Sequence, residues 1–340
     1  MDNMLTCSAE GMRRMAPGLG SMGKNPFERL AESAMSHATE HYHRPWWKWP
    51  PSWIIFIAAV LLLSIAAIER IDKSVDTMPL ELNTPQAVGL AYREVAIPTE
   101  NGKHLFGWFI PAAWGEPAPA VVVLHGWGSN AGMMLPLAPL LHRAGYAMLL
   151  FDARNHGQSD SDGSSSLPGF AEDLEHALDW LALQPGVDAA RLSVLGHSLG
   201  AGAALLVASR RDLAAVVSIS AFADPESNMR RFLASYHIPY FPFGHVLRYV
   251  KQHIMGYNFS DIAPRNTIRR IRFPVLLVHG SEDDTVPVAD AKAIYAERPG
   301  ENVRLVILAG GHDLTQQAER HAGELIDFFD QATGRGKGGQ

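Results

Sequence analysis

Gly196-His197-Ser198-Leu199-Gly200 is the stretch that decides the fold, because its flanks have the character of a strand and of a helix. The residues before it, 191–195, form a short and mainly apolar run of strand character. The residues after it, 201–208, are rich in helix formers that are small enough to pack against a sheet. A serine between two such elements lies on a sharp turn, with its hydroxyl near the positive end of the helix dipole. The stretch therefore predicts a strand–turn–helix unit that carries Ser198 as a nucleophile, although an ordinary glycine-rich turn is the alternative.

Two acidic residues follow a second strand-like run further along the chain. Residues 273–280 are typical of a buried strand, and residues 281–287 after them contain Asp283 and Asp284. A carboxylate just beyond the carboxyl end of a strand lies at the edge where open α/β sheets carry their sites. A turn-forming or helix-capping aspartate is the alternative interpretation, and the pattern leaves open which of the two residues acts.

A histidine follows the next strand-like run. Residues 303–308 have strand character, and Gly310-Gly311-His312 comes shortly after them. A loop of this kind allows an imidazole to reach the serine, which is a poor nucleophile unless a neighbouring base activates it. We therefore expect His312 to be that base, with a surface histidine as the alternative.

A glycine-punctuated loop also follows a strand-like run upstream of the serine. Residues 120–124 are apolar and lead into His125-Gly126-Trp127-Gly128. Such a loop can donate a backbone N–H to a developing oxyanion, and the N–H of Leu199 is the expected second donor. A simple strand-to-helix turn would have the same composition.

These motifs together resemble those of the α/β-hydrolase superfamily, and the resemblance extends over about residues 92–329. It implies a catalytic triad in the chain order Ser198, Asp283 and His312. It also implies that Asp283, and not Asp284, is the acid. The general style is that of the dienelactone-hydrolase and prolyl-oligopeptidase-like branches, without a propeller domain.

The same resemblance assigns the oxyanion donors and a further turn. The backbone N–H of Trp127 falls on the family's upstream donor, beside that of Leu199. Residues 152–159 resemble the family's D-x-R-x-H-G-x-S turn. We interpret this turn as structural, so that His156 is not the base.

A serine hydrolase that cleaves a carboxylic ester through an acyl-enzyme is the function that these residues indicate. Peptide and thioester bonds are cleaved by the same machinery, so a serine peptidase or a thioesterase is the alternative. A non-catalytic, membrane-tethered binding module is a further one, although such modules typically lack a triad member. The expected partner is a small-molecule ester or a lipid-like substrate.

Composition excludes several other classes. The formal net charge of −6 gives no reason to expect nucleic acid as a partner. The single cysteine, Cys7, cannot form an internal disulfide, and no Cys/His spacing indicates a zinc site. No cofactor and no metal are therefore expected.

The order of predicted elements indicates an α/β fold. Residues 93–98 and 104–110 are predicted to form a hairpin through Asn101-Gly102. From residue 120 onward, strands alternate with helical stretches at residues 133–143, 170–183 and 199–209. This alternation predicts a mostly parallel, eight-stranded α/β-hydrolase sheet flanked by helices, in a catalytic domain of residues 92–332.

A long connection interrupts this alternation at about residues 221–270. The resemblance implies that it is a helical cap over the active site. We expect most of its many aromatic side chains to pack the cap's own core and a few to line an acyl pocket. The run Arg269-Arg270-Ile271-Arg272 is expected to be a solvated face.

The N-terminal part of the chain predicts a membrane anchor. Residues 1–45 have no sustained apolar period and are predicted to be disordered, whereas residues 54–68 contain no charge. Together with the preceding tryptophan cluster, that run predicts a transmembrane helix at residues 46–70, followed by a linker at 71–91. A cleaved signal peptide is the alternative. Residues 333–340 are expected to be a flexible tail.

The orientation of this single-pass span rests on weak charge asymmetry. Basic residues are more numerous before the apolar run than directly after it. This bias favours a cytoplasmic N-terminus, which would leave the catalytic domain on the non-cytoplasmic side of the membrane.

Overall fold

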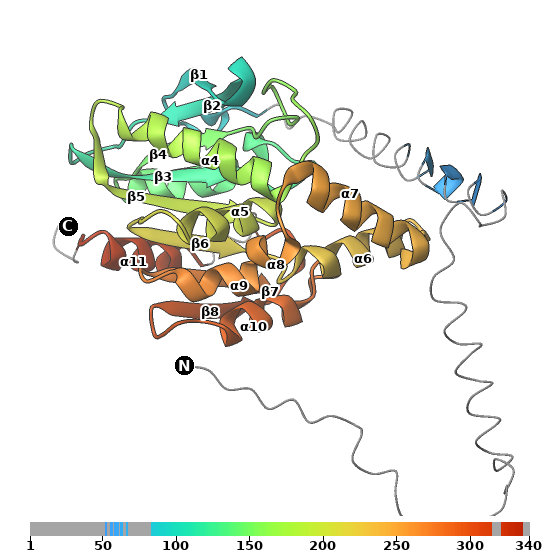
Figure 1. Ribbon diagram of the computed structural model, residues 1–340. Coiled ribbons are helices and arrows are strands. Elements are labelled where there is room, and N and C mark those ends of the chain that lie inside the picture. Colours follow the sequence, from blue (N-terminus) through green and yellow to red (C-terminus); the bar gives the residue numbers. More distant parts are fainter. Residues whose placement is uncertain are drawn as a thin grey trace, which may run out of the picture. The chain divides into compact units, whose positions relative to one another are not determined.

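The computed structural model describes residues 83–314 and 321–335, together with single positions between 52 and 66. The strands and helices presented below all belong to one unit of the chain, residues 60–340. In Figure 1 they form a central sheet with helices packed on both of its faces.

The predicted N-terminal segments fall largely elsewhere. The predicted disordered tail, residues 1–45, lies outside the described residues, as do most of the predicted span at 46–70 and of the linker at 71–91. Most of the predicted C-terminal tail, residues 333–340, also lies outside them. Within the described part of the chain, no helix is long and apolar enough to cross a bilayer.

Eight strands form the sheet, in the spatial order β1-β2-β4-β3-β5-β6-β7-β8. The strands are β1 (Arg93–Pro98), β2 (His104–Ile110), β3 (Ala118–Leu124), β4 (Ala147–Phe151), β5 (Val187–His197), β6 (Ala215–Ile219), β7 (Val275–Gly280) and β8 (Val303–Leu308). Only the β1–β2 and β2–β4 pairs are antiparallel, and the others are parallel. The prediction of a mostly parallel eight-stranded sheet is confirmed.

The predicted hairpin is also confirmed. β1 pairs with β2 in a register that sets Pro98 opposite His104, and the short helix η3 (Glu100–Gly102) joins them. Asn101 and Gly102 have φ values of 57° and 68°, a left-handed conformation that suits asparagine and glycine.

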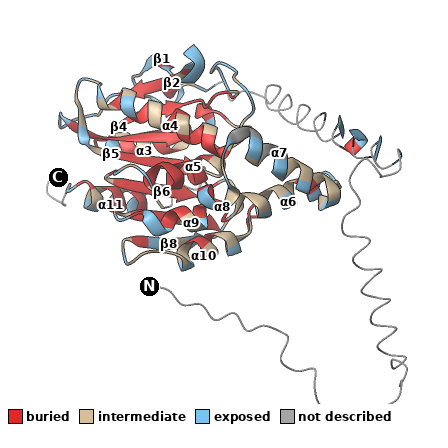
Figure 2. Ribbon diagram, in the orientation of Figure 1, coloured by how far each residue is buried: buried red, intermediate tan, exposed pale blue. Residues whose placement is uncertain are grey.

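Helices cover the two faces of the sheet as two separate layers. They are η2 (Pro85–Val88), η4 (Ala131–Leu137), α3 (Ala138–Arg143), α4 (Leu167–Ala182), α5 (Leu199–Ala208), α10 (Val288–Ala296) and α11 (Ala322–Ala332). Alternate residues of β3 point to opposite faces, as the period of a strand requires. Val122 and Leu124 belong to the core that includes α4 and α5, and Val121 and Val123 to the core that includes α3 and α11. In Figure 2 the central strands β3, β4 and β6 are buried, whereas the edge strands β1 and β8 are partly exposed.

The predicted helices are present, with shifts at their starts that capping explains. α4 begins at Leu167, three residues before the predicted start, because the Ser166 hydroxyl accepts a hydrogen bond from the Gly169 N–H at 3.1 Å. The stretch predicted at residues 133–143 begins as the 3-10 helix η4, which contains Pro136.

The long connection between β6 and β7 consists of short helices. They are α6 (Pro225–Ser235), η5 (Tyr240–Gly244), α7 (His245–Met255), α8 (Phe259–Ile262), α9 (Pro264–Thr267) and η6 (Ile268–Arg270). α6 begins where the Asp224 carboxylate accepts hydrogen bonds from the backbone N–H groups of Glu226 and Ser227.

Three of the aromatic side chains of this insertion are exposed. Tyr236, Phe241 and Tyr249 are 58%, 77% and 62% exposed. The insertion is built from short helices that share little interior, so it does not have room for every ring.

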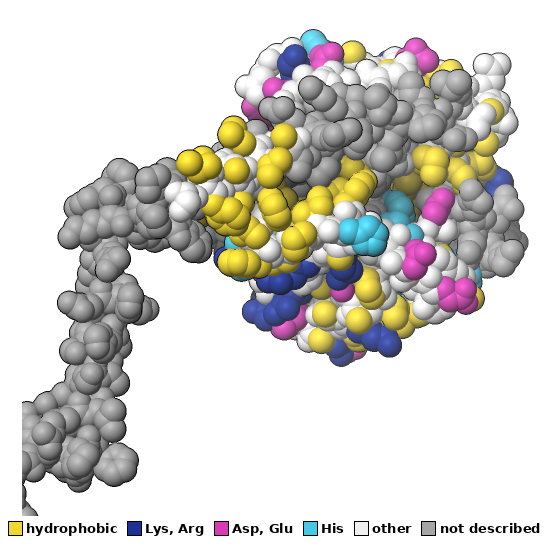
Figure 3. Space-filling view, turned by 90° about the vertical axis from the view of Figure 1, so that its right-hand side faces the viewer, with side chains coloured by type: hydrophobic (Ala, Val, Ile, Leu, Met, Phe, Trp, Pro, Cys, Tyr) yellow, Lys and Arg dark blue, Asp and Glu magenta, His cyan; other side chains and the backbone are white. Residues whose placement is uncertain are grey.

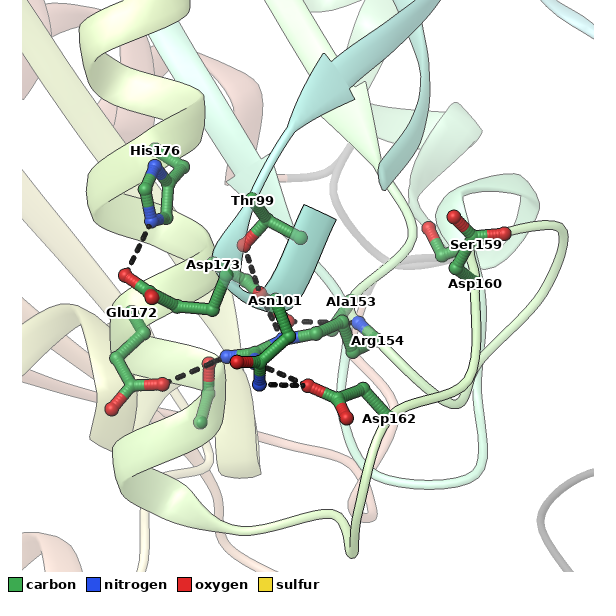
Figure 4. A network of polar contacts seen from close by, with 12 residues as sticks. Thr99, Asn101, Ala153, Arg154, Ser159, Asp160, Asp162, Glu172, Asp173 and His176 are labelled. Carbon is green, nitrogen blue, oxygen red and sulfur yellow. Dashed lines mark hydrogen bonds and ion pairs between the residues drawn. The ribbon is translucent and has the colours of Figure 1, made fainter. Parts of the chain in front are cut away.

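A buried arginine holds the turn that follows β4 (Figure 4). The guanidinium of Arg154 donates to Asp173 at 2.6 Å and to Glu172 at 2.8 Å, and it lies 3.4 Å from a carboxylate oxygen of Asp162. Asp173 also accepts a hydrogen bond from the Thr99 hydroxyl at 3.0 Å. The network joins this turn to α4 and to the end of β1, which supports its interpretation as structural.

Candidate active site

Ser198 occupies a strained turn between β5 and α5. Its φ is 52° and its ψ is −113°, a conformation that costs a residue with a side chain about 1–3 kcal/mol. The Ser198 N–H donates to the carbonyl oxygen of Ile219 at 2.8 Å, which ties the turn to the end of β6. The predicted strand–turn–helix unit is therefore present, and the serine is the residue that absorbs its strain.

The two glycines of the pentapeptide are required by close packing. A Cβ on Gly196 would lie 2.3 Å from the carbonyl oxygen of Gly200, and a Cβ on Gly200 would lie 2.4 Å from the carbonyl oxygen of His125. Any side chain at either position would thus meet backbone atoms that cannot move aside. The glycines let α5 start directly beneath the serine and against the loop after β3.

Three predicted site residues, from loops after three different strands, form one hydrogen-bonded series. The Ser198 hydroxyl lies 3.0 Å from Nε2 of His312, and Nδ1 of His312 lies 2.8 Å from Oδ2 of Asp283. A carboxylate only accepts, so the proton of the neutral imidazole lies on Nδ1 and Nε2 accepts from the serine. The arrangement can deprotonate the serine hydroxyl and keep the imidazole oriented while it does so.

The Asp283 side chain is fully buried yet well supplied with proton donors. Its Oδ1 accepts from the backbone N–H groups of Thr285 at 3.0 Å and Val286 at 2.8 Å. Its Oδ2 lies 3.2 Å from Nε2 of His279, in addition to His312. Burial raises the pKa of Asp283, but the hydrogen bonds from His279, His312 and Val286 outweigh it and hold the pKa well below its usual range.

The neighbouring aspartate has a different environment. Asp284 is exposed, and its carboxylate accepts only from the hydroxyl of Thr285, at 3.3 Å, among the hydrogen bonds described for it. The structure thus brings Asp283 to the histidine and leaves Asp284 in solvent.

The loop after β3 lies against the serine. A Cβ on Gly126 would be 3.0 Å from the Cβ of Ser198, so the backbone that leads to Trp127 borders the nucleophile. Leu199 is the first residue of α5, where backbone N–H groups have no partner within the helix. Leu199 thus adjoins Ser198 in sequence, and Trp127 follows a residue that packs against it.

A buried pair of histidines stabilises this loop and remains apart from the serine. The Ala153 N–H donates to Nε2 of His125 at 3.0 Å, and Nδ1 of His125 donates to the Gly126 carbonyl at 2.6 Å. Burial, followed by the neighbouring His156, lowers the pKa of His125 to about 3. His156 in turn directs Nδ1 to the Arg154 carbonyl at 2.9 Å. These contacts support a structural role for His156.

Two residues that the sequence did not single out hold the backbone of the histidine loop. The carbonyl oxygen of His312 accepts from Nε2 of His197 at 3.0 Å and from the hydroxyl of Ser220 at 3.0 Å. Ser220 itself has a φ of 55°, which is unusual for a residue with a side chain. The two donors fix where the His312 loop approaches Ser198.

His279 is the third residue that sequence reasoning missed. It is the penultimate residue of β7, and its buried Nε2 also lies 2.8 Å from the carbonyl oxygen of Val286. Two of the three residues lie within motifs that the sequence showed. His279 is the first residue of the motif that contains Asp283, and His197 is the second residue of the pentapeptide. Ser220 has no comparable signature. No cluster of metal-binding side chains occurs among the described residues.

Comparisons with known proteins agree with this fold. The family model that describes the alpha/beta hydrolase fold matches residues 119–237. The chain is 33% identical over 224 residues to the uncharacterized protein Rv2307c of Mycobacterium tuberculosis, a match that covers 66% of this chain and 73% of that protein. It is 30% identical to the lysophosphatidylserine lipase ABHD12 of Danio rerio, over 64% of this chain and 61% of that protein.

A solved structure is similar as well. The esterase Pf2001 of Pyrococcus furiosus aligns with a TM-score of 0.62 and 25% sequence identity. The alignment covers 75% of this chain and 98% of the esterase.

Proposed function

This chain belongs to the α/β-hydrolase superfamily, and we propose that it is a membrane-anchored serine hydrolase that cleaves carboxylic esters with a hydrophobic acyl group. The observation that carries the proposal is the hydrogen-bonded series Ser198–His312–Asp283 on a strained serine turn. The esterase and lysophosphatidylserine lipase activities in the names of two similar proteins support the ester as the substrate class.

Catalysis proceeds through an acyl-enzyme. His312 Nε2 takes the proton of the Ser198 hydroxyl as Oγ attacks the ester carbonyl carbon. The backbone N–H groups of Trp127 and Leu199 stabilise the oxyanion of the tetrahedral intermediate. His312 then gives its proton to the leaving alkoxide, so that the alcohol departs and the acyl group stays on Ser198.

Water completes the cycle by the same steps. His312 removes a proton from the attacking water, and a second tetrahedral intermediate collapses to release the acid and restore the Ser198 hydroxyl. Asp283 keeps Nδ1–H of His312 oriented and stabilises the imidazolium in both halves. Its low pKa supports this role, because the carboxylate stays ionised throughout.

We also propose that residues 46–70 anchor the protein as a single transmembrane helix, with the catalytic domain on the non-cytoplasmic side. The uncharged run at residues 54–68 and the adjoining tryptophan cluster support it. Protease protection of the full chain in sealed vesicles of known orientation tests the side. In right-side-out vesicles, whose interior is the cytoplasmic side, protease should digest the catalytic domain without opening the vesicles. Digestion only after the vesicles are opened would contradict the assignment.

Hydrolysis of a p-nitrophenyl ester series by the full chain tests the activity, with Ser198→Ala as its matched partner. We expect serine-dependent turnover with an optimum at acyl chains longer than acetyl. A folded wild-type chain that hydrolyses peptides or thioesters in preference would indicate the alternative substrate classes. A folded chain without any hydrolytic activity would favour a binding module.

A further inference from the structure

Three large aromatic side chains are exposed on neighbouring elements of the helical insertion. Tyr236 follows α6, Phe241 lies in η5 and Tyr249 lies in α7, and each is more than half exposed. We call these three residues the cap patch. Monomeric proteins rarely gather exposed rings in this way unless another surface covers them.

Positive charge accompanies the cap patch. Residues 221–272 contain eight arginine and lysine residues against three acidic ones, in a chain whose overall net charge is −6. Among the arginines of this segment, Arg230, Arg265, Arg269, Arg270 and Arg272 are exposed. Figure 3 shows a cluster of Lys and Arg side chains on this side of the molecule. The insertion is therefore both apolar and basic, in contrast to the rest of the chain.

A series of ring contacts leads from the cap patch to the candidate active site. Tyr236 packs on Phe232, with ring centroids 5.0 Å apart, and Phe232 packs edge-on against Trp127 at 5.8 Å. Trp127 belongs to the loop that borders Ser198. An apolar acyl chain that reaches Tyr236 from outside thus meets a continuous aromatic surface as far as the oxyanion loop.

From these observations we propose that the cap patch docks on a phospholipid bilayer that contains anionic lipids, and that acyl chains enter the site from there. Exposed aromatic rings enter the interfacial layer of a bilayer, and arginines beside them attract anionic headgroups. This inference rests on the proposed function, because it assumes an anchored hydrolase of hydrophobic esters. The twelve residues from 71 to 82 span at most about 43 Å when fully extended, so an anchored domain stays within reach of the bilayer.

A fluorescent label tests the docking directly in the full chain. The only cysteine is replaced by Cys7→Ser, and an environment-sensitive dye is attached at Phe241→Cys. Leu183→Cys, at the end of α4, is the matched control because Leu183 is 83% exposed and lies outside the insertion. The chain is reconstituted in phosphatidylcholine vesicles with and without phosphatidylglycerol, each with or without a spin-labelled lipid.

We expect the dye at position 241 to emit at shorter wavelength and to be quenched by the spin-labelled lipid, more strongly with phosphatidylglycerol. The dye at position 183 should keep its aqueous emission. Equal quenching at both positions would overturn the proposal. A dye at position 241 that emits at shorter wavelength but is not quenched by the spin-labelled lipid would overturn the proposal too. That result would indicate that protein, and not lipid, covers the patch.

Turnover provides a second readout. For Phe241→Ser/Tyr249→Ser we expect hydrolysis of p-nitrophenyl palmitate held in anionic vesicles to fall about tenfold, since two rings no longer enter the bilayer. Hydrolysis of water-soluble p-nitrophenyl acetate should be unchanged, as should both rates for Leu183→Ser. An equal loss on both substrates would contradict docking. Flotation with the vesicles reports on the anchor, and turnover of the soluble ester reports on the hydrolase. If both are observed but the dye at position 241 is not quenched, the docking proposal alone is contradicted.

Discussion

Two polar clusters lie at the carboxyl ends of the strands and differ in chemistry. The cluster after β4 joins Arg154 to the carboxylates of Asp162, Glu172 and Asp173, and the cluster after β5, β7 and β8 contains Ser198, Asp283 and His312. In the first, the full charge of an arginine is matched by carboxylates and nothing is left to react. In the second, an imidazole connects a carboxylate to a hydroxyl on a strained turn.

Two buried aspartates, Asp152 in the turn after β4 and Asp283 in the loop after β7, show the difference most clearly. Asp152 accepts from the backbone N–H groups of Ala131 at 2.6 Å and Gln158 at 2.8 Å, and burial outweighs both and raises its pKa to about 6. Asp283 has two backbone donors as well, but it also has two imidazoles, and its pKa is lowered. Burial alone therefore does not suit a carboxylate to catalysis. In Asp283 the hydrogen bonds from two imidazoles keep the carboxylate ionised.

The largest expected effect separates the clusters by activity. Ser198→Ala or His312→Ala should lower kcat by about 10⁶, because the two residues act as one unit. The thermal unfolding midpoint should change little for Ser198→Ala, since alanine removes one hydrogen bond of a partly exposed hydroxyl. Near-normal turnover by Ser198→Ala in steady-state assays would contradict the assignment.

The acid position should show the next largest effect. Asp283→Asn is expected to lower kcat by about 10⁴, because an amide favours the wrong tautomer of His312. Asp284→Asn, the exposed neighbour, should retain most of the activity. The same ester assay measures both, and a reversed order would show that the acid is Asp284.

Stability, unlike activity, should depend mainly on the cluster after β4. Arg154→Met leaves the buried carboxylate of Asp173 without its cation and should destabilise the fold by about 3–5 kcal/mol. The control is Arg211→Met, which removes a more exposed ion pair with Asp179 and should cost about 1 kcal/mol or less. Denaturant unfolding measures both changes. Unaltered stability of Arg154→Met would remove the distinction between the clusters.

The raised pKa of Asp152 predicts a pH dependence of stability. Its folded value of about 6 exceeds the ordinary 3.8, so between these values the folded state holds a proton that the unfolded state has lost. The contribution of Asp152 to stability should therefore decrease by about 2 kcal/mol as pH rises from 4 to 6. Subtracting the unfolding free energy of Asp152→Asn from that of the wild-type chain at each pH isolates this contribution. A difference that does not change with pH would contradict it.

The smallest expected effect concerns the backbone of the histidine loop. Ser220→Ala removes one of two hydrogen bonds to the His312 carbonyl and should lower kcat about tenfold, with little change in KM. Ser193→Ala, another buried serine on a strand, should leave kcat unchanged. Equal kcat values for Ser220→Ala and Ser193→Ala in the ester assay would show that Ser220 does not position His312.

Much of this architecture follows from local sequence. The pentapeptide with its flanks predicted β5, the turn and α5 because a strand, a tight glycine pair and a helix start are all encoded within one short segment. Likewise, Asn101 and Gly102 predicted the hairpin through their tolerance of positive φ. The alternation of apolar runs was sufficient to predict the parallel sheet.

Contacts between distant segments were less accessible. Residue pattern alone did not choose between Asp283 and Asp284, because the direction of each side chain depends on how the loop folds onto β7. The contacts of His197 and Ser220 with the His312 carbonyl join residues 115 and 92 positions apart. Nor does composition reveal that Phe241 is exposed, since an aromatic residue is compatible with a core or a surface until its neighbours are known.

Covalent trapping of the serine tests the central claim most directly. The full chain is treated with a fluorophosphonate, which phosphonylates activated serines, and is then digested and analysed by mass spectrometry. We predict one adduct, on the peptide that contains Ser198, and its loss in Ser198→Ala together with hydrolytic activity. An adduct on a different serine, or ester hydrolysis that survives in Ser198→Ala, would contradict the account.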